Sequence, residues 1–263
     1  WGDKLEKPST YNPLDFFQTG FNTMNSIAVS TGTETNQTHI SFGAVNSEGI
    51  IDNNKYNRYN FTFRNSWDIV KNVLSMDMGL FYIKQNNQNS NGQGMYYNPL
   101  VPIYLFPPSD DINKYAVYER YDADRNFKTQ YWPYGNQGLG MQNPYWIINR
   151  NMFNTDRDRY IISLSMKWNI TNWLNIIGRA RIDNAYTDFE RKLYASTDGL
   201  FAKSQGNYMN QEDKNTSTYL DFLVNVDKKF GENYHLLVNL GGSFYDEKYK
   251  SDTFEGNLVG VPN

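Results

Sequence analysis

Residues that could perform chemistry are sparse in this sequence. It has 263 residues, no cysteine and two histidines, His39 and His235. The histidines are far apart in the chain, so neither an HExxH pattern nor any other zinc-ligand spacing exists. We expect both histidines to lie on strand faces. Ser243 follows two glycines, but the residues after it do not complete a nucleophile elbow, so the pattern does not support a serine hydrolase.

One acidic segment could bind a cation. Asp122, Asp124 and Asn126 place oxygen ligands at alternate positions, as at the start of a calcium loop. The glycine and the distal glutamate that complete such a loop are missing, which leaves a solvated acidic loop as the alternative. None of the 28 acidic residues lies in an apolar context that would raise its pKa for general acid catalysis. We therefore predict no metal site, no cofactor and no enzyme.

Aromatic side chains are the strongest candidates for ligand contact. The segment 85–157 lacks clear periodicity and is rich in aromatic residues and turn formers, which predicts a long loop with a binding role. Tryptophan and tyrosine rings can pack on the apolar faces of sugars or peptides while their polar tips form hydrogen bonds. The predicted substrate contacts are Trp132, Tyr134, Tyr145 and Trp146. The alternative is that these rings pack the loop against the rest of the protein.

The composition limits the class of protein that holds this loop. Aromatic residues make up 16% of the chain, yet its mean hydropathy is −0.71. A wide transmembrane barrel has both properties, because apolar residues alternate with polar ones and aromatic residues form girdles at both membrane interfaces. The net charge is −3 and the basic residues are scattered, so we exclude nucleic acid as a partner. No apolar run is long enough for a membrane helix, so a membrane-embedded form would have to be a barrel.

A period-2 alternation predicts the elements that position the loop. Similar segments of about ten residues recur along the chain, which predicts about eight strands arranged as hairpins. One face of such a strand suits lipid and the other suits water. In the clearest segment the apolar face holds Tyr160, Ile162, Leu164, Met166, Trp168 and Ile170. The arginines on polar faces are expected to pair with acidic residues across the wall; they are Arg58, Arg64, Arg179 and Arg181.

The predicted connections between strands alternate in length. The short ones lie near 33–36, 69–72, 171–173 and 230–233, and the long ones near 46–56, 85–157 and 188–214. Outer-membrane barrels have short periplasmic turns and longer extracellular loops. A soluble sandwich has no reason to keep all its long connections at one end. The pattern therefore predicts an antiparallel transmembrane β-barrel with long extracellular loops, the longest of them 85–157.

The first 60 residues resemble the SusC family of TonB-dependent transporters of Bacteroidota, at the point where the plug ends and the barrel begins. The family has a Trp-Gly-Pro-x-Leu-Asp-Gly element, then Asn-Pro followed by Phe-Phe-x-Thr-Gly, then an Asn-Ser-Val-Ser-Val-Ser strand and a strand that ends in Gly-Ile-Ile. The counterparts in this chain are Trp1–Glu6, Asn12–Gly20, Asn25–Ser30 and Glu48–Ile51.

The resemblance implies what the whole protein does. Members of the family lie in the bacterial outer membrane and import a bulky nutrient, an oligosaccharide or a peptide. Energy reaches their plug through TonB, and a SusD-like surface lipoprotein covers the barrel. Their barrels have 22 strands and are wide enough to hold a plug, so this chain is expected to be a fragment with about eight of those strands. Residues 1–25 would then be the plug-to-barrel segment and 26–263 a partial barrel.

Two other interpretations remain open. A secreted β-rich glycan-binding or glycoside-hydrolase module would pack two sheets face to face, and the outward residues at 160–182 would then be buried by protein. A small standalone barrel of eight strands, acting as an adhesin or anchor, would instead close on itself. The three interpretations differ in what covers the apolar face and in whether the sheet has open edges.

Overall fold

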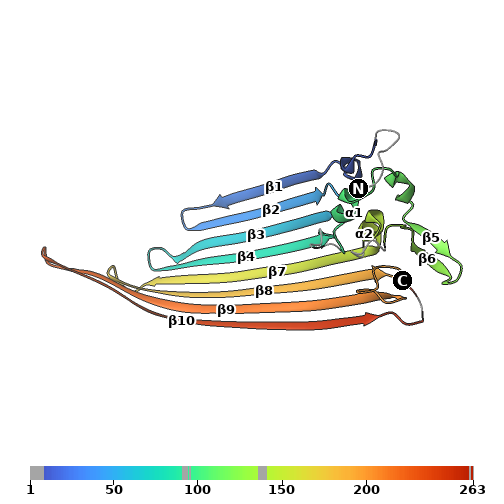
Figure 1. Cartoon of the computed structure of the whole chain (residues 1–263). Coiled ribbons are helices and arrows are strands. Elements are labelled where there is room, and N and C mark those ends of the chain that lie inside the picture. Colours follow the sequence, from blue (N-terminus) through green and yellow to red (C-terminus); the bar gives the residue numbers. More distant parts are fainter. Residues whose placement is uncertain (1–8, 91–93, 95, 136–140, 261, 263) are drawn as a thin grey trace.

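An antiparallel sheet of eight strands dominates the computed structural model, which describes residues 9–90, 94, 96–135, 141–260 and 262 (Figure 1). The motif at Trp1–Glu6 therefore lies outside the described residues. Each strand pairs with its neighbour in chain order, except that β5 and β6 form a separate hairpin between β4 and β7. The sheet strands are β1 (Phe21–Gly32), β2 (Asn36–Glu48), β3 (Lys55–Val70), β4 (Leu74–Gln88), β7 (Asn151–Asn169), β8 (Leu174–Tyr194), β9 (Gly206–Phe230) and β10 (Tyr234–Asn257).

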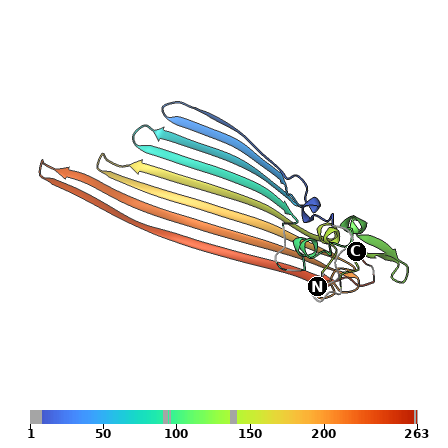
Figure 2. The same ribbon diagram turned by 45° about the horizontal axis from the view of Figure 1, so that its top comes forward.

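The remaining elements gather at one end of the sheet, as both views show (Figures 1 and 2). They are η1 (Pro13–Phe16), α1 (Leu100–Tyr104), η2 (Ile112–Tyr115), β5 (Glu119–Asp122), β6 (Phe127–Gln130) and α2 (Pro144–Arg150). No described helix is long and apolar enough to cross a membrane. The opposite end of the sheet carries the short turns, at 33–35, 71–73, 170–173 and 231–233. The predicted hairpins and the segregation of their short turns to one end are confirmed.

The long connections are shorter than the sequence predicts, because the strands are longer. They span 49–54, 89–150 and 195–205, where the alternation placed them near 46–56, 85–157 and 188–214. Many of the added strand residues are polar, and they lie on both faces. On β7, for example, Asp156 and Arg157 are neighbours on opposite faces, so the apolar alternation that reveals a strand is lost there.

The register aligns the apolar residues of all eight strands on one face. Ile162 of β7 lies between Leu80 of β4 and Ile182 of β8. Protein does not cover this face in the described part of the chain: Ile162 is 45% exposed and Trp168 is 52% exposed. The burial that a two-sheet soluble module requires is therefore absent from 160–182. The fold class predicted from the alternation, a section of an antiparallel barrel wall, is confirmed.

The apolar face forms a band that crosses the sheet obliquely. On β7 it begins at Tyr160, beyond which Asp158 occupies the same face. On β3 the upper edge of the band is Tyr59. When the register is followed from strand to strand across the sheet, the residue of β10 in line with Tyr59 is Lys250. Below Lys250, the first apolar residue on this face of β10 is Phe244, six residues lower; Phe254 lies on the same face beyond the polar positions 246 to 252. The successive turns are displaced in the same direction (Figure 1).

The sheet has two open edges. Within the described residues β1 pairs only with β2, and β10 pairs only with β9. The eight strands therefore do not close into a small barrel, and the standalone barrel is wrong. The sequence prediction of an open section of a wall is confirmed in this respect.

Candidate functional site

The described residues between β4 and β7 build a small body with its own core, which we call the loop body (89–150). Its buried centre consists of Ile103, Phe106, Ile112 and Tyr115. Aromatic rings surround this centre in tilted and edge-to-face contacts, with centroid separations between 5.0 and 6.0 Å around Phe106. A body packed in this way presents its surface residues in fixed positions.

Asp110 is the polar hub of the loop body. Its carboxylate accepts hydrogen bonds from the Nζ of Lys114 at 2.8 Å, the hydroxyl of Tyr115 at 2.6 Å and the hydroxyl of Tyr134 at 2.8 Å. These donors stabilise the ionised carboxylate, so they hold the pKa of Asp110 well below its usual range. The same bonds raise the pKa of the Tyr115 hydroxyl, because it donates to an anion. The hub fixes Tyr134 to the start of η2.

Asn143 connects the loop body to α2. Its side-chain oxygen accepts from the backbone N–H of Tyr145 and caps the helix, while Pro144 occupies the first helical position. The Nδ2 of Asn143 donates to the carbonyls of Tyr115 and Tyr131, at 2.8 and 3.0 Å. Asn143 is fully buried, and all these bonds lie inside the protein. One side chain therefore ends the loop, starts the helix and orients Tyr145.

The four predicted contact residues have different surroundings. Trp132 and Tyr134 line a hollow of about 110 Å³ together with Pro102, Leu105, Phe106, Pro107 and Met141. The indole nitrogen of Trp132 is buried and has no hydrogen-bond partner in the described part of the chain. Tyr145 is partly buried and contacts Phe16 edge to face. The structure therefore brings Trp132 and Tyr134 together at one hollow.

Trp146 packs inside the protein. Only 1% of its surface is exposed, and its indole N–H donates to the hydroxyl of Thr197, which in turn donates to Asn151. These bonds join α2 to the connection 195–205 and to the start of β7. A ligand on the surface cannot reach this ring in the present arrangement, which is the packing alternative that the sequence left open for the aromatic residues.

Residues before β1 also belong to this site, which the sequence did not indicate. The hydroxyl of Tyr11 donates to the carbonyl of Ile103 at 2.6 Å, and Ser9 donates to the carbonyl of Pro108 at 2.7 Å. Burial raises the pKa of Tyr11 to about 12, so the hydroxyl remains a donor at neutral pH. The contacts join positions about a hundred residues apart, and no local pattern reveals them.

The acidic segment of the loop body forms a turn. The carboxylate of Asp122 accepts from the backbone N–H groups of Asp124 and Arg125, and Asn126 adopts a positive φ of 58°. These bonds close the hairpin between β5 and β6. Among the described residues no group of three histidine, aspartate or glutamate side chains is placed to hold a metal ion.

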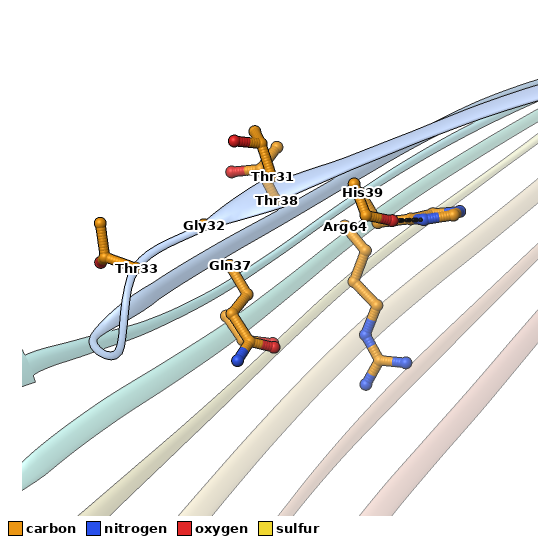
Figure 3. A pocket seen from close by; sticks show the side chains of 9 residues that line it. Thr31, Gly32, Thr33, Gln37, Thr38, His39 and Arg64 are labelled. Carbon is orange, nitrogen blue, oxygen red and sulfur yellow. Dashed lines mark hydrogen bonds between the residues drawn. The ribbon is translucent and has the colours of Figure 1, made fainter.

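The polar face of the sheet holds a second hollow, of about 590 Å³, near the turn between β1 and β2 (Figure 3). Gln37 and Arg64 extend to one side of the sheet there, and Thr31 and Thr38 extend to the other. The Nδ1 of His39 lies 2.8 Å from the hydroxyl of Ser30. His39 is thus a strand-face residue as predicted, and so is His235, whose Nε2 lies 2.6 Å from Asp227.

Three of the four polar-face arginines pair with acidic residues, and two of these pairs cross the wall as predicted. Arg64 contacts Asp77 of β4, Arg179 contacts Asp221 of β9, and Arg181 contacts Asp183 two residues away on β8. The prediction is wrong for Arg58, which contacts no acidic side chain among the described residues; its Nε donates to the side-chain oxygen of Asn60. The partner of Arg58 is thus an amide and not a carboxylate. Asn60 can reach it because residues two apart on a strand lie on the same face.

Comparison with known proteins adds a structural likeness. No family model and no curated protein matches the sequence. Solved structures do match: that of the RagAB peptide transporter superposes with a TM-score of 0.68 over 91% of this chain, at 15% identity. The fold is similar to part of RagAB. Two further structures, of the RagAB peptide importer in "closed-closed" and "open-open" states, each superpose with a TM-score of 0.71 over 94% and 96% of this chain, at 14% and 15% identity.

The likeness to RagAB concerns a part of that transporter. This chain covers between 26% and 28% of the RagAB chains, so it spans about a quarter of their length. At this level of identity the likeness establishes the fold. All three matches described are structures of a transporter.

Proposed function

We propose that this chain is a section of the wall of a SusC-like TonB-dependent transporter, in the outer membrane of a bacterium. The observation that carries the proposal is the exposed apolar band. On β7 it extends from Tyr160 to Trp168, five outward positions with an aromatic residue at each end. The band thus covers nine residues of the strand, which matches the roughly 9–11 residues of a tilted transmembrane strand, and its aromatic ends match the girdles at the two interfaces.

The slope of the band gives independent support. Its upper edge descends six residues between β3 and β10, five strand steps apart. Six residues span roughly 20 Å along a strand and five steps span roughly 24 Å across the sheet, which corresponds to a tilt of about 40°. Strands of outer-membrane barrels tilt by about 35–45°. A band that is level with the membrane therefore requires the strand tilt of such a barrel.

In this proposal the polar face lines the interior of the barrel. The hollow at His39 and Arg64 lies at the short-turn end, where the periplasmic side of the barrel would be, and would contact the plug through which TonB acts. The loop body would lie outside the cell. Three exposed apolar residues of the loop body would contact a SusD-like surface lipoprotein; they are Tyr104, Leu105 and Val117.

The imported nutrient is proposed to be an oligosaccharide or a peptide. Growth tests the function directly: cells that express the complete protein are compared with cells that lack it, and with cells that lack TonB. Each strain receives one member of a panel of oligosaccharides or casein peptides as its limiting nutrient. Growth on at least one panel member should require both proteins. Equal growth of all strains on every member would contradict the proposal.

Trp132, Tyr134 and Tyr145 are proposed to contact the nutrient. The hollow beside Trp132 and Tyr134 supports this role. Trp132→Ala should weaken binding of the panel member that supports growth about tenfold, from loss of ring contact. Tyr121→Ala is the matched control, because Tyr121 is an exposed ring on the same loop body, away from the hollow. Equal effects of the two substitutions would rule out the site.

A further inference from the structure

The polar face carries a third hollow, of about 370 Å³, across β8, β9 and β10. It is lined by Arg181, Asp183, Ser217, Tyr219 and Tyr245. Its volume falls within the range of about 300–1,000 Å³ that is usual for ligand sites. It lies level with the upper edge of the apolar band. On β8 this edge is Ile182, between the lining residues Arg181 and Asp183, and on β10 it is Phe244, next to Tyr245.

The ion pairing beneath this hollow has one cation in excess. Asp183 is held by Arg159, whose Nε donates to Oδ1 at 2.8 Å and whose NH2 donates to Oδ2 at 2.6 Å. This two-pronged arrangement already satisfies the carboxylate. Arg181 adds a single bond to Oδ2, at 3.1 Å. Two guanidinium groups on one carboxylate leave a surplus positive charge.

The surplus charge is the accessible one. The side chain of Arg181 is 50% exposed, whereas that of Asp183 is 14% exposed. Among the described residues Arg181 donates to Asp183 alone, so its other N–H groups remain free to donate. Its register neighbours across the sheet are Tyr219 and then Tyr245, which place two phenol rings beside the guanidinium.

The other charged groups near the hollow are Asp221, which pairs with Arg179 and also accepts from the hydroxyl of Tyr219, and Glu247, which lies opposite Ser217. One of its oxygens accepts from the Nδ2 of Asn215 at 2.9 Å and the other accepts from the hydroxyl of Tyr245 at 2.8 Å. Both oxygens of Glu247 are thus engaged by neutral donors. These bonds hold Glu247 to Asn215 and Tyr245, so the free N–H groups of Arg181 remain the charged donors that an anionic ligand in the hollow would meet.

We propose that Arg181, flanked by Tyr219 and Tyr245, is a binding site for the carboxylate of a ligand inside the barrel. A guanidinium can bind a carboxylate through two parallel N–H bonds, and the flanking rings can pack on the adjoining apolar part of the ligand. The carboxylate could belong to a peptide terminus or to an acidic sugar. The inference rests on the proposed function, because it takes the polar face to line the import pathway.

The fold should tolerate removal of Arg181. Arg181→Gln leaves Asp183 paired with Arg159, so no buried charge loses its partner. Arg157→Gln is the matched control: Arg157 is exposed on the polar face of β7, carries the same charge and does not line the hollow. Unchanged thermal melting of both variants would verify that they fold.

Equilibrium binding to the complete protein in detergent tests the site. The probes form two pairs, each of an acid and its neutral form. The first pair is an N-acetylated alanine peptide with a free C-terminal carboxylate and the same peptide with a C-terminal amide. The second pair is an oligogalacturonate and its methyl ester. The acid form of at least one pair should bind about tenfold or more tightly than its neutral partner. Arg181→Gln should abolish this preference, and Arg157→Gln should keep it. The pair that shows the preference identifies the source of the carboxylate.

Two outcomes would overturn the site: no preference for the acid form in either pair, or a preference that survives Arg181→Gln. Binding is measured without transport, so these outcomes are separate from those of the growth experiment. A preference that depends on Arg181 in a protein that supports no TonB-dependent growth would contradict the proposed function alone. Growth without any such preference would contradict the carboxylate site alone.

Discussion

At the scale of residues, the polar side chains of this protein act by fixing one another in place. Asp110 accepts hydrogen bonds from a lysine and two tyrosine hydroxyls. Asn143 caps α2 and donates hydrogen bonds to two backbone carbonyls. In each case one short side chain satisfies several partners that are distant in sequence. Such hubs organise the loop body more strongly than its few turns of helix do, because short helices have little stability of their own.

The Asp110 hub should make the loop body sensitive to acid. Its pKa is lowered in the folded state, so the carboxylate contributes stability above its ordinary pKa of about 3.9 and loses it as the pH falls further. The protection of residues 89–150 against hydrogen exchange, taken relative to the intrinsic exchange rate at each pH, should be constant from pH 7 to pH 5 and should fall below about pH 4.

The variant Asp110→Asn isolates this contribution. It replaces hydrogen bonds to an anion by weaker ones, which should cost ~1.5–3 kcal/mol of local stability at neutral pH. Exchange in the loop body should then be faster at pH 7 and should depend less on pH in the acid range. If the variant were as protected as the unaltered protein at pH 7, the hub would not hold the loop body together.

At the scale of elements, each long strand divides into a membrane-like part and a polar extension. The part of β7 from Tyr160 to Trp168 alternates between apolar and polar residues, whereas Asp156 and Arg157 make both faces polar beyond it. The alternating part could be predicted from the sequence because the two faces meet different surroundings. The extension could not, because identical surroundings on both faces leave no alternation.

The helices of the loop body illustrate a different limit. The sequence Asn143-Pro144 has the N-cap and first-turn signature of a helix, and attention to it could have found α2. The burial of Trp146 depends on Thr197, in another connection, and no local signal indicates such a contact. Sequence reasoning therefore identified an aromatic loop and could not separate the rings that pack from those at the surface.

Charge substitutions on β7 test the assignment of its faces. Leu164→Arg places a charge in the middle of the apolar band and should cost ~2–4 kcal/mol in a lipid bilayer. Ser165→Arg places the same charge one residue along, on the polar face, and should be nearly neutral. Urea unfolding of the complete protein in lipid vesicles measures both. Equal costs for the two variants would show that the faces do not meet different environments.

At the scale of the whole molecule, the chain is an open wall with a folded body at one end. The body joins residues before β1 to the connections 89–150 and 195–205, so the long connections form one unit. At the other end the strands are joined by short turns, and no described helix or separate hairpin packs there (Figure 1). This polarity suits a barrel whose outer mouth binds and whose opposite mouth opens toward the periplasm.

The central claim is that the apolar face contacts lipid, and spin labels along β7 test it most directly. In the complete protein in lipid, each position from 156 to 170 receives a nitroxide in turn, and its collisions with oxygen and with a water-soluble nickel complex are measured. Even positions from 160 to 168 should favour oxygen, which concentrates in lipid, and odd positions should not. Labels at Asp156 and Asp158 should favour the nickel complex. Even positions that neither reagent reaches, as under a second layer of protein, would contradict the account.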